Sequence, residues 1–160
     1  MSIWSINLLI PKKDSFTKDD LSLLDRFKDN FNKLINHIDN QDLNSYMNFI
    51  VESLFAANKY FNDQEPWSKK SNTARLNTIV YVSLEIIRKI SIMLYPIIPS
   101  SSLKALKIFN IQEKDIKFDS IKNHDQLIIN NKINKIDILF KKIDHKNDWF
   151  TLSFGSWPII

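Results

Sequence analysis

Cysteine is absent from this chain of 160 residues, which excludes disulfides and thiolate metal sites and favours a reducing cytoplasm. Glycine occurs once, at Gly155, so there is no glycine-rich loop that could bind phosphates. No apolar run approaches the length that crosses a membrane, and the N-terminus lacks the order of segments typical of a secretory signal. We therefore expect a cytoplasmic protein with no membrane partner.

Residues for metal binding and nucleophilic catalysis are also scarce. The three histidines are scattered, and none has a second histidine or a carboxylate at ligand spacing on one helical face. Ser100 to Ser102 follow a proline and have no neighbouring base, so they indicate a helix cap rather than a nucleophile. We expect no metal, no cofactor and no catalytic residue in this chain.

The charge balance permits an RNA partner without requiring one. The net charge is +4, from 22 basic and 18 acidic residues. Only three of the basic residues are arginine, and lysine, asparagine and isoleucine are abundant in the way that AT-rich codons favour. Genome composition can account for much of this basic charge, so the net charge by itself identifies no partner.

Apolar residues recur at three-to-four spacing in three long segments, which predicts three helices. The first begins at a capping pair, Thr17 with Asp20, and its apolar face continues to Ile38. Asp39 or Asn40 can cap the second helix, which extends to a proline at position 66.

The second predicted helix carries an apolar stripe that includes Ile50 and Leu54, with one polar residue, Asn58, upon it. Tyr46 and Tyr60 add a second apolar flank, so this helix is expected to touch neighbours on two sides.

The third predicted helix begins at Asn72 or Thr73 and is the most apolar of the three. Its stripe is flanked by charged residues, namely Arg75, Glu85, Arg88 and Lys89. Pro96 and Pro99 kink or stop it, and a short fourth helix follows over roughly residues 103–109. Long helices with short connections pack as antiparallel neighbours, so the sequence predicts an all-α antiparallel bundle.

The chain divides into three parts by pattern. Residues 1–14 are predicted to be an irregular N-terminal segment, and residues 15–144 form the helical domain. Residues 145–160 hold two of the four tryptophans and share no pattern with the rest. We expect this tail to be poorly ordered and to pack poorly against the bundle.

The candidate functional site lies in residues 57–67, Ala-Asn-Lys-Tyr-Phe-Asn-Asp-Gln-Glu-Pro-Trp. Pro66 ends the second helix and presents Trp67, and two cations, Lys69 and Lys70, follow. An aromatic ring beside cations is typical of sites for single-stranded nucleotides, where the ring stacks on a base and the cations meet phosphates. The alternative is that Trp67 covers one end of the core beside solvated lysines.

This stretch resembles the signature of the anticodon-binding domain of methionyl-tRNA synthetases. Asn58-Lys59-Tyr60 is similar to the family's Asn-Lys/Arg-Tyr motif, and Pro66-Trp67 to its Pro-Trp pair. The resemblance covers roughly residues 16–144 and includes further elements at Arg75-Leu76, Val80-Tyr81, the run Leu94-Tyr95-Pro96-Ile97-Ile98-Pro99-Ser100, and Ile136 to Asp144.

The resemblance implies a helical bundle of the class I synthetase anticodon-binding type and a partner in methionine tRNA, tRNA(Met). It implies that Trp67 stacks on an anticodon base and that Pro66 fixes its presentation. The candidate tRNA-binding residues are Trp67, Pro66, Asn58, Lys59, Lys69, Lys70 and Arg75. For Asn58 the helical pattern leaves a structural role open, a hydrogen bond to a helix end inside the bundle.

Two features of the family are missing from the sequence. The first anticodon helix of the family carries Asn-Leu-x-x-Arg, whereas Asn7-Leu8-Leu9-Ile10-Pro11 has no arginine and has a proline. Either Asn7 is a chance match or that helix has been lost. The His-Ile-Gly-His-like and Lys-Met-Ser-Lys-Ser motifs of the catalytic domain are also absent. ATP and methionine would therefore belong to a catalytic domain that this chain lacks.

Three interpretations of function remain at this point. The first is a tRNA-anticodon-binding module, which takes part in aminoacylation only with a catalytic domain, for example on a separate synthetase chain. The second is a non-catalytic helical bundle, or the remnant of a split or decaying gene, that no longer binds RNA. The third is the equivalent domain of a leucine-, isoleucine- or valine-type synthetase.

We predict that the purified 160-residue chain does not activate methionine, because none of its segments can hold the phosphates of ATP. Methionine-dependent ATP–pyrophosphate exchange should stay at background, with an intact methionyl-tRNA synthetase as the positive control. Exchange above background with the pure chain would contradict this.

Overall fold

The computed structural model describes residues 9–135 of the chain. Its helices, in order, are α1 (Lys18–Asp29), α2 (Phe31–Asp39), α3 (Leu43–Gln64), the 3-10 helix η1 (Pro66–Ser68), α4 (Thr73–Leu94), α5 (Pro99–Lys107), η2 (Glu113–Asp115) and η3 (Phe118–Lys122). Within residues 9–135 there is no strand, only one isolated antiparallel bridge between Leu9 and Lys132. The predicted all-α fold is confirmed. The expected segment at 136–144 and the tail at 145–160 lie outside the described residues.

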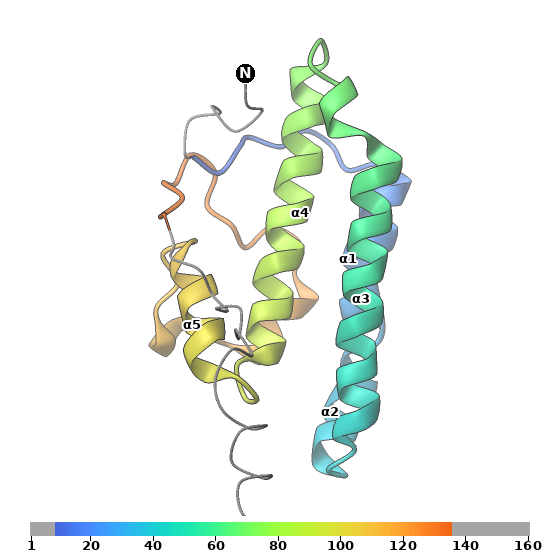
Figure 1. Cartoon of the computed structure of the whole chain (residues 1–160), viewed down its shortest axis with the longest axis vertical. Helices are drawn as coiled ribbons and strands as arrows, with labels where there is room; N and C mark the ends of the chain where they lie inside the picture. Colours follow the sequence, from blue (N-terminus) through green and yellow to red (C-terminus); the bar gives the residue numbers. More distant parts are fainter. Residues whose placement is uncertain (1–8, 136–160) are drawn as a thin grey trace, which may run out of the picture.

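The long helices run antiparallel, as Figure 1 shows. α3 and α4 lie side by side, α1 and α2 lie behind α3, and α5 packs on the far side of α4. The turn between α3 and α4 stands at one end of the bundle, and this turn carries the candidate site.

The first predicted helix is two helices in the structure. The capping pair is confirmed, since the Asp20 amide donates to Thr17 Oγ1 over 3.4 Å and the Thr17 amide to Asp20 Oδ2 over 2.8 Å. The helix breaks at Asn30, whose side-chain amide donates to the carbonyl of Arg26 over 2.9 Å. An asparagine that binds the preceding turn in this way competes with the helical backbone, which explains the break that periodicity did not reveal.

The predicted cap of the second helix is wrong. α2 continues through Asp39, and the cap of α3 is Asp42, which accepts from the Ser45 amide over 3.1 Å. Gln41, at φ 58°, supplies the left-handed residue of the connection between α2 and α3.

The buried face of α3 is also rotated from the predicted stripe. Its buried residues are Tyr46, Ile50, Ser53 and Tyr60. Leu54, on the predicted stripe, is 44% exposed, and Asn58 is exposed too. The tyrosines belong to the core because their hydroxyl groups find partners inside it. Tyr46 donates to the carbonyl of Met93 over 2.8 Å, and Tyr60 donates to Asp20 over 2.6 Å.

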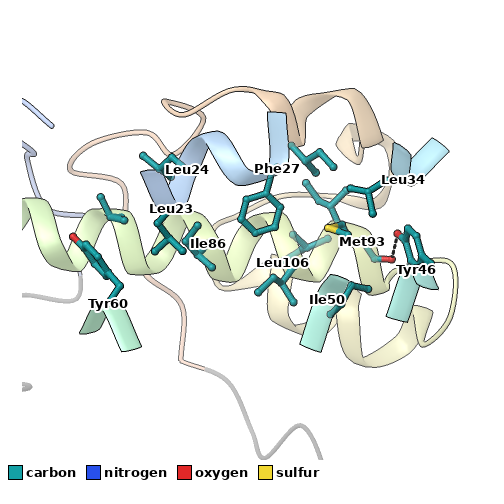
Figure 2. Packing of buried hydrophobic residues seen from close by; sticks show 14 of the residues in the cluster. Leu23, Leu24, Phe27, Leu34, Tyr46, Ile50, Tyr60, Ile86, Met93 and Leu106 are labelled. Atoms are coloured by element: carbon teal, nitrogen blue, oxygen red, sulfur yellow. Dashed lines mark hydrogen bonds between the residues drawn. The ribbon is translucent and has the colours of Figure 1, made fainter. Parts of the chain in front are cut away.

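The hydrophobic core lies between α1, α3 and α4, and Figure 2 shows its packing. Phe27 of α1, Ile50 of α3 and Ile86 of α4 are each almost fully buried there. Tyr60 stands at one end of the cluster and Tyr46 at the other. The hydroxyl groups of the two tyrosines therefore lie at the two ends of the apolar core.

α4 is buried on nearly every side. Its buried residues include charged side chains that the sequence places beside the apolar stripe. Arg88 donates to both carboxylate oxygens of Glu85 and to the carbonyl of Ser120. Lys89 donates to the carbonyl of Ile121 over 2.6 Å. Burial lowers the pKa of Lys89 to about 8, although Glu85 opposes that shift. Residues 118–127 cover this face of α4, and sequence periodicity cannot show such a cover.

The described part of the N-terminal segment has no helix, but it is packed. Ile10 is fully buried and forms a second apolar cluster with Tyr81, Phe109 and Leu127. The Ile10 amide donates to the carbonyl of Asn131 over 2.8 Å, which ties the two chain ends of the described range together.

We predict unequal costs for two substitutions on one helix. Ile50→Ala should lower the free energy of unfolding by about 2–5 kcal/mol, because it leaves a cavity in the core. Leu54→Ala, the matched control, should change it by about 0.5 kcal/mol or less, because Leu54 is exposed. Urea unfolding followed by circular dichroism measures both. Equal losses would show that the buried face of α3 is misassigned.

Candidate nucleic-acid interface

The turn after α3 begins where Pro66 stops the helix. α3 ends at Gln64, and Glu65 adopts φ 44°, the left-handed region. Pro66 disfavours the right-handed helical conformation for Glu65, so the helix cannot pass through it. A left-handed non-glycine residue costs about 1–2 kcal/mol, which the surrounding turn must offset.

Trp67 is the central residue of the 3-10 helix η1 in this turn. It is 45% exposed, whereas Pro66 beneath it is buried. The ring meets Phe61 edge-on, with 6.2 Å between centroids and an interplanar angle of 61°. The Ser68 amide donates to the carbonyl of Glu65 over 2.9 Å, and the Ser68 hydroxyl donates to the same oxygen. These bonds close the turn locally, and about half of Trp67 remains in solvent.

The candidate lysines differ in what they contact. Lys59 lies 2.6 Å from Asp63, and its side chain is 76% exposed. Lys70 is exposed and Lys69 is half-buried, both in the turn after Trp67. Within the part of the chain that the structure describes, neither of these two has an ion pair. Lys69 and Lys70 are thus the cations of the turn that are available to an anion.

Arg75 is placed differently from the lysines. Its Nη1 donates to Asp20 Oδ2 over 2.6 Å, and its Nη2 donates to Asp20 Oδ1 over 2.9 Å and to Gln64 Oε1 over 2.5 Å. Asp20 is fully buried, and it also accepts the hydroxyl proton of Tyr60. The sequence indicates Asp20 only as a capping residue, because no spacing signal links positions 20, 60 and 75.

The pKa shifts of Asp20 and Tyr60 agree with a cluster whose members satisfy one another. Burial raises the pKa of Asp20, but hydrogen bonds from Arg75, Tyr60 and Thr17 outweigh it and lower the pKa below its ordinary value. Burial, with the Asp20 carboxylate beside it, raises the pKa of Tyr60 far above its ordinary range. Asp20 is therefore held as a carboxylate, and Tyr60 as a donor.

Asn58 does not have the core role that the helical pattern leaves open. It is exposed, and within the described residues no hydrogen bond of its side chain is found. It precedes Phe61 by three positions, which places the two side chains on one face of α3. Asn58 thus lies on the side of α3 that leads to Trp67.

Other kinds of site have no counterpart among the residues that the structure describes. No group of three His, Cys, Asp or Glu side chains could hold a metal ion there. No helix in that range is long and apolar enough to cross a membrane.

Comparison with known proteins identifies the family. The family model described as the anticodon binding domain of methionyl tRNA ligase matches residues 10–156. The chain belongs to this family. The resemblance drawn from the sequence is confirmed, and the methionyl type is preferred over the leucine, isoleucine or valine types. Because the match ends at residue 156, the predicted domain boundary at residue 144 stays a prediction.

Individual relatives of this family agree. The chain is 34% identical to methionine–tRNA ligase of Thermotoga maritima over 122 residues, which are 75% of this chain and 19% of that protein. It is 31% identical to the Brucella suis enzyme over 113 residues, 70% of this chain and 22% of that protein. The chain thus spans about a fifth of the length of these relatives.

A solved structure of a methionyl-tRNA synthetase has the same fold over most of this chain. The apo methionyl-tRNA synthetase of Mycobacterium tuberculosis superposes with a TM-score of 0.78 over 86% of this chain and 28% of that one, at 23% identity. This likeness shows the shared fold, and the turn with Trp67 lies within the residues that the family model matches.

We predict that Asp20 makes stability depend on pH at the acid end. Because its folded pKa is depressed, its contribution is full above the ordinary carboxyl value of 3.8 and is lost as the pH falls through the folded value. Urea unfolding of the parent between pH 2 and pH 6 should show this loss, and Asp20→Asn should lack it.

The matched control is Asp63→Asn, which removes a carboxylate from an exposed pair on α3. It should leave the acid-end slope close to that of the parent, since exposed pairs contribute little. A parent and an Asp20→Asn variant with identical slopes would refute the assignment.

Proposed function

We propose that this domain binds the anticodon of methionine tRNA non-covalently, with the Trp67 ring stacked on an anticodon base. The observation that carries the proposal is a half-exposed tryptophan on a turn with a fixed backbone, beside Lys69 and Lys70. A base stacked on the exposed ring would place its phosphates near these cations. Asn58, on the face of α3 that leads to Trp67, is proposed to contact the same RNA.

The roles of the remaining candidates follow from their contacts. Pro66 is buried and would fix the direction of the turn rather than touch RNA. Lys59 is proposed to contact phosphate only weakly, because Asp63 neutralises it locally. No ATP or methionine site is proposed here, since those ligands would bind to the part of the synthetase relatives that this chain does not match.

A second candidate function is favoured by one observation. The family's Asn-Leu-x-x-Arg helix has no counterpart at residues 9–11, where Ile10 is buried and bridges to Asn131 in a segment without helix. The side chains that read base edges would then be missing, and the domain would bind RNA without preference or not at all. Asn7 lies outside the described residues.

A partner for catalysis is part of the first proposal. Aminoacylation would need the remaining four fifths of a synthetase, on a separate chain or on a longer form of this one. The outer face of α3 offers such a partner an apolar surface, since Val51 is 42%, Leu54 44% and Phe55 69% exposed. We propose that this encounter takes place in the cytoplasm.

We predict that Trp67→Ala weakens binding to methionine tRNA by roughly ten- to a hundredfold, because base stacking contributes about 1–3 kcal/mol. Filter binding or anisotropy at a fixed salt concentration measures the effect. The double variant Lys69→Ala with Lys70→Ala should also weaken binding, and its salt dependence should be shallower because phosphate contacts are lost.

Phe55→Ala is the matched control, because Phe55 is an exposed aromatic residue far from the turn on α3. Thermal melts must accompany the assay, since a tryptophan that closed the core would instead cost about 3–5 kcal/mol of stability. A folded Trp67→Ala protein that binds like the parent would remove the anticodon proposal. A parent that prefers methionine tRNA no more than random RNA of equal length would favour the second candidate function.

A further inference from the structure

The side chains of Asp20, Tyr60, Gln64 and Arg75 form a polar unit beneath the turn, which we call the anchor cluster. We infer that the anchor cluster positions Trp67 for RNA, and that Arg75 acts through Trp67 rather than by contacting phosphate. The inference rests on the proposed function, because it explains how the stacking residue is held. It assigns a role in RNA binding to Asp20 and Tyr60, which are buried and cannot touch RNA in this structure.

The first argument is connectivity. Gln64 is the last residue of α3, and Arg75 is the third residue of α4, so the bond between Nη2 and Oε1 joins the two ends of the turn. The Asp20 carboxylate then ties this joint to α1 through both of its oxygens. The span from residue 65 to residue 72 is therefore closed at its base, and Trp67 lies within it.

The second argument is that both outer nitrogens of Arg75 are already engaged by protein partners. Nη1 is bonded to Asp20, and Nη2 is bonded to Asp20 and Gln64. A phosphate could take over the two nitrogens that face Asp20 only by leaving a fully buried carboxylate without its partner. Removing one member of a buried pair is strongly unfavourable, so phosphate contact by Arg75 is disfavoured.

The third argument is that the turn needs external support. Glu65 holds a left-handed backbone at φ 44°, which relaxes readily if the ends of the turn separate. Phe61 meets the Trp67 ring in an edge arrangement, with 6.2 Å between the ring centroids. The anchor cluster supplies the restraint that these local contacts lack, because it binds the turn to two neighbouring helices.

Asp20→Asn is the decisive substitution, because an effect of net charge and a loss of Trp67 positioning would change the affinity for RNA in opposite directions. It raises the net charge by one, so a purely electrostatic effect would strengthen RNA binding. The positioning role predicts instead that binding to methionine tRNA weakens about three- to tenfold, because a charge-assisted pair is replaced by a weaker one. Arg75→Gln should weaken binding likewise.

A spectroscopic measurement tests the position of Trp67 without RNA. In a background of Trp4→Phe, Trp149→Phe and Trp157→Phe, Trp67 is the only tryptophan of the chain. Asp20→Asn and Arg75→Gln should each shift its emission maximum and change its quenching by acrylamide. Arg26→Gln is the matched control, because Arg26 is another partly buried arginine that pairs with a carboxylate, the exposed Glu52, away from the turn. It should change neither quantity.

The salt dependence of binding separates positioning from phosphate contact. If Arg75 touched phosphate, Arg75→Gln would reduce the slope of log affinity against log salt by about 0.7–0.9. The inference predicts an unchanged slope with a uniformly weaker affinity. In the Trp67→Ala background, Asp20→Asn should weaken binding no further, since the residue that it positions is gone.

The anchor cluster is overturned as a positioning unit if Asp20→Asn strengthens tRNA binding, or if Trp67 emission stays that of the parent. Tyr60→Phe, which removes one hydroxyl group, replaces Asp20→Asn if the latter fails to fold, and the same shifts are expected on a smaller scale. Failure of the proposed function gives a different result. There, Trp67→Ala leaves tRNA binding unchanged while the emission of Trp67 still responds to Asp20→Asn.

Discussion

The Asp20 carboxylate is the interaction on which the arrangement of α1, α3 and α4 depends. It is fully buried, yet it accepts from the Thr17 amide, the Tyr60 hydroxyl and two nitrogens of Arg75. A buried charge is tolerated only when such partners satisfy it, and the partners must keep their positions. The carboxylate therefore constrains how the three helices can slide or rotate against each other, which apolar contacts alone do loosely.

A second polar layer acts in the same way farther along α4, at Arg88 and Lys89. Arg88 and Lys89 donate to carbonyls of residues 120 and 121, and His124 lies 2.9 Å from Asp25. Lys89 Nζ lies 3.5 Å from the other ring nitrogen of His124, so both ring nitrogens have a polar partner. His124 is thus a satisfied structural histidine. These contacts fasten the irregular segment after α5 to the bundle, together with the buried side chains of Ile121 and Leu127.

The turn between α3 and α4 combines an exposed aromatic ring, that of Trp67, with a backbone whose two ends are bonded to each other. A tryptophan on a mobile loop would lose conformational entropy when it stacked on a base, and affinity would fall accordingly. Here the backbone around Trp67 is closed by its own hydrogen bonds and by the anchor cluster below it. Helix packing in this way restrains the position of Trp67, the residue proposed to bind RNA.

The sequence by itself determined the fold class, the capping of α1 by Thr17 and Asp20, the end of α3 before Pro66 and the start of α4 at Thr73. Each of these depends on residues within a few positions of each other, and local spacing records such relations. The family could be read for the same reason, because its signature is the short run around Pro66-Trp67.

Only the tertiary structure decided which face of α3 is buried, that Asn58 is exposed, and that Arg75 pairs with a carboxylate 55 residues away. Apolar periodicity favoured Leu54 over Tyr60, because it does not count a hydroxyl group that finds its partner inside the core. The break at Asn30 was not predicted because the asparagine side chain adds its own bond to the Arg26 carbonyl without changing the apolar pattern. Long-range polar pairs leave no period in a sequence, so the contacts that hold Trp67 became visible only once the helices were packed together.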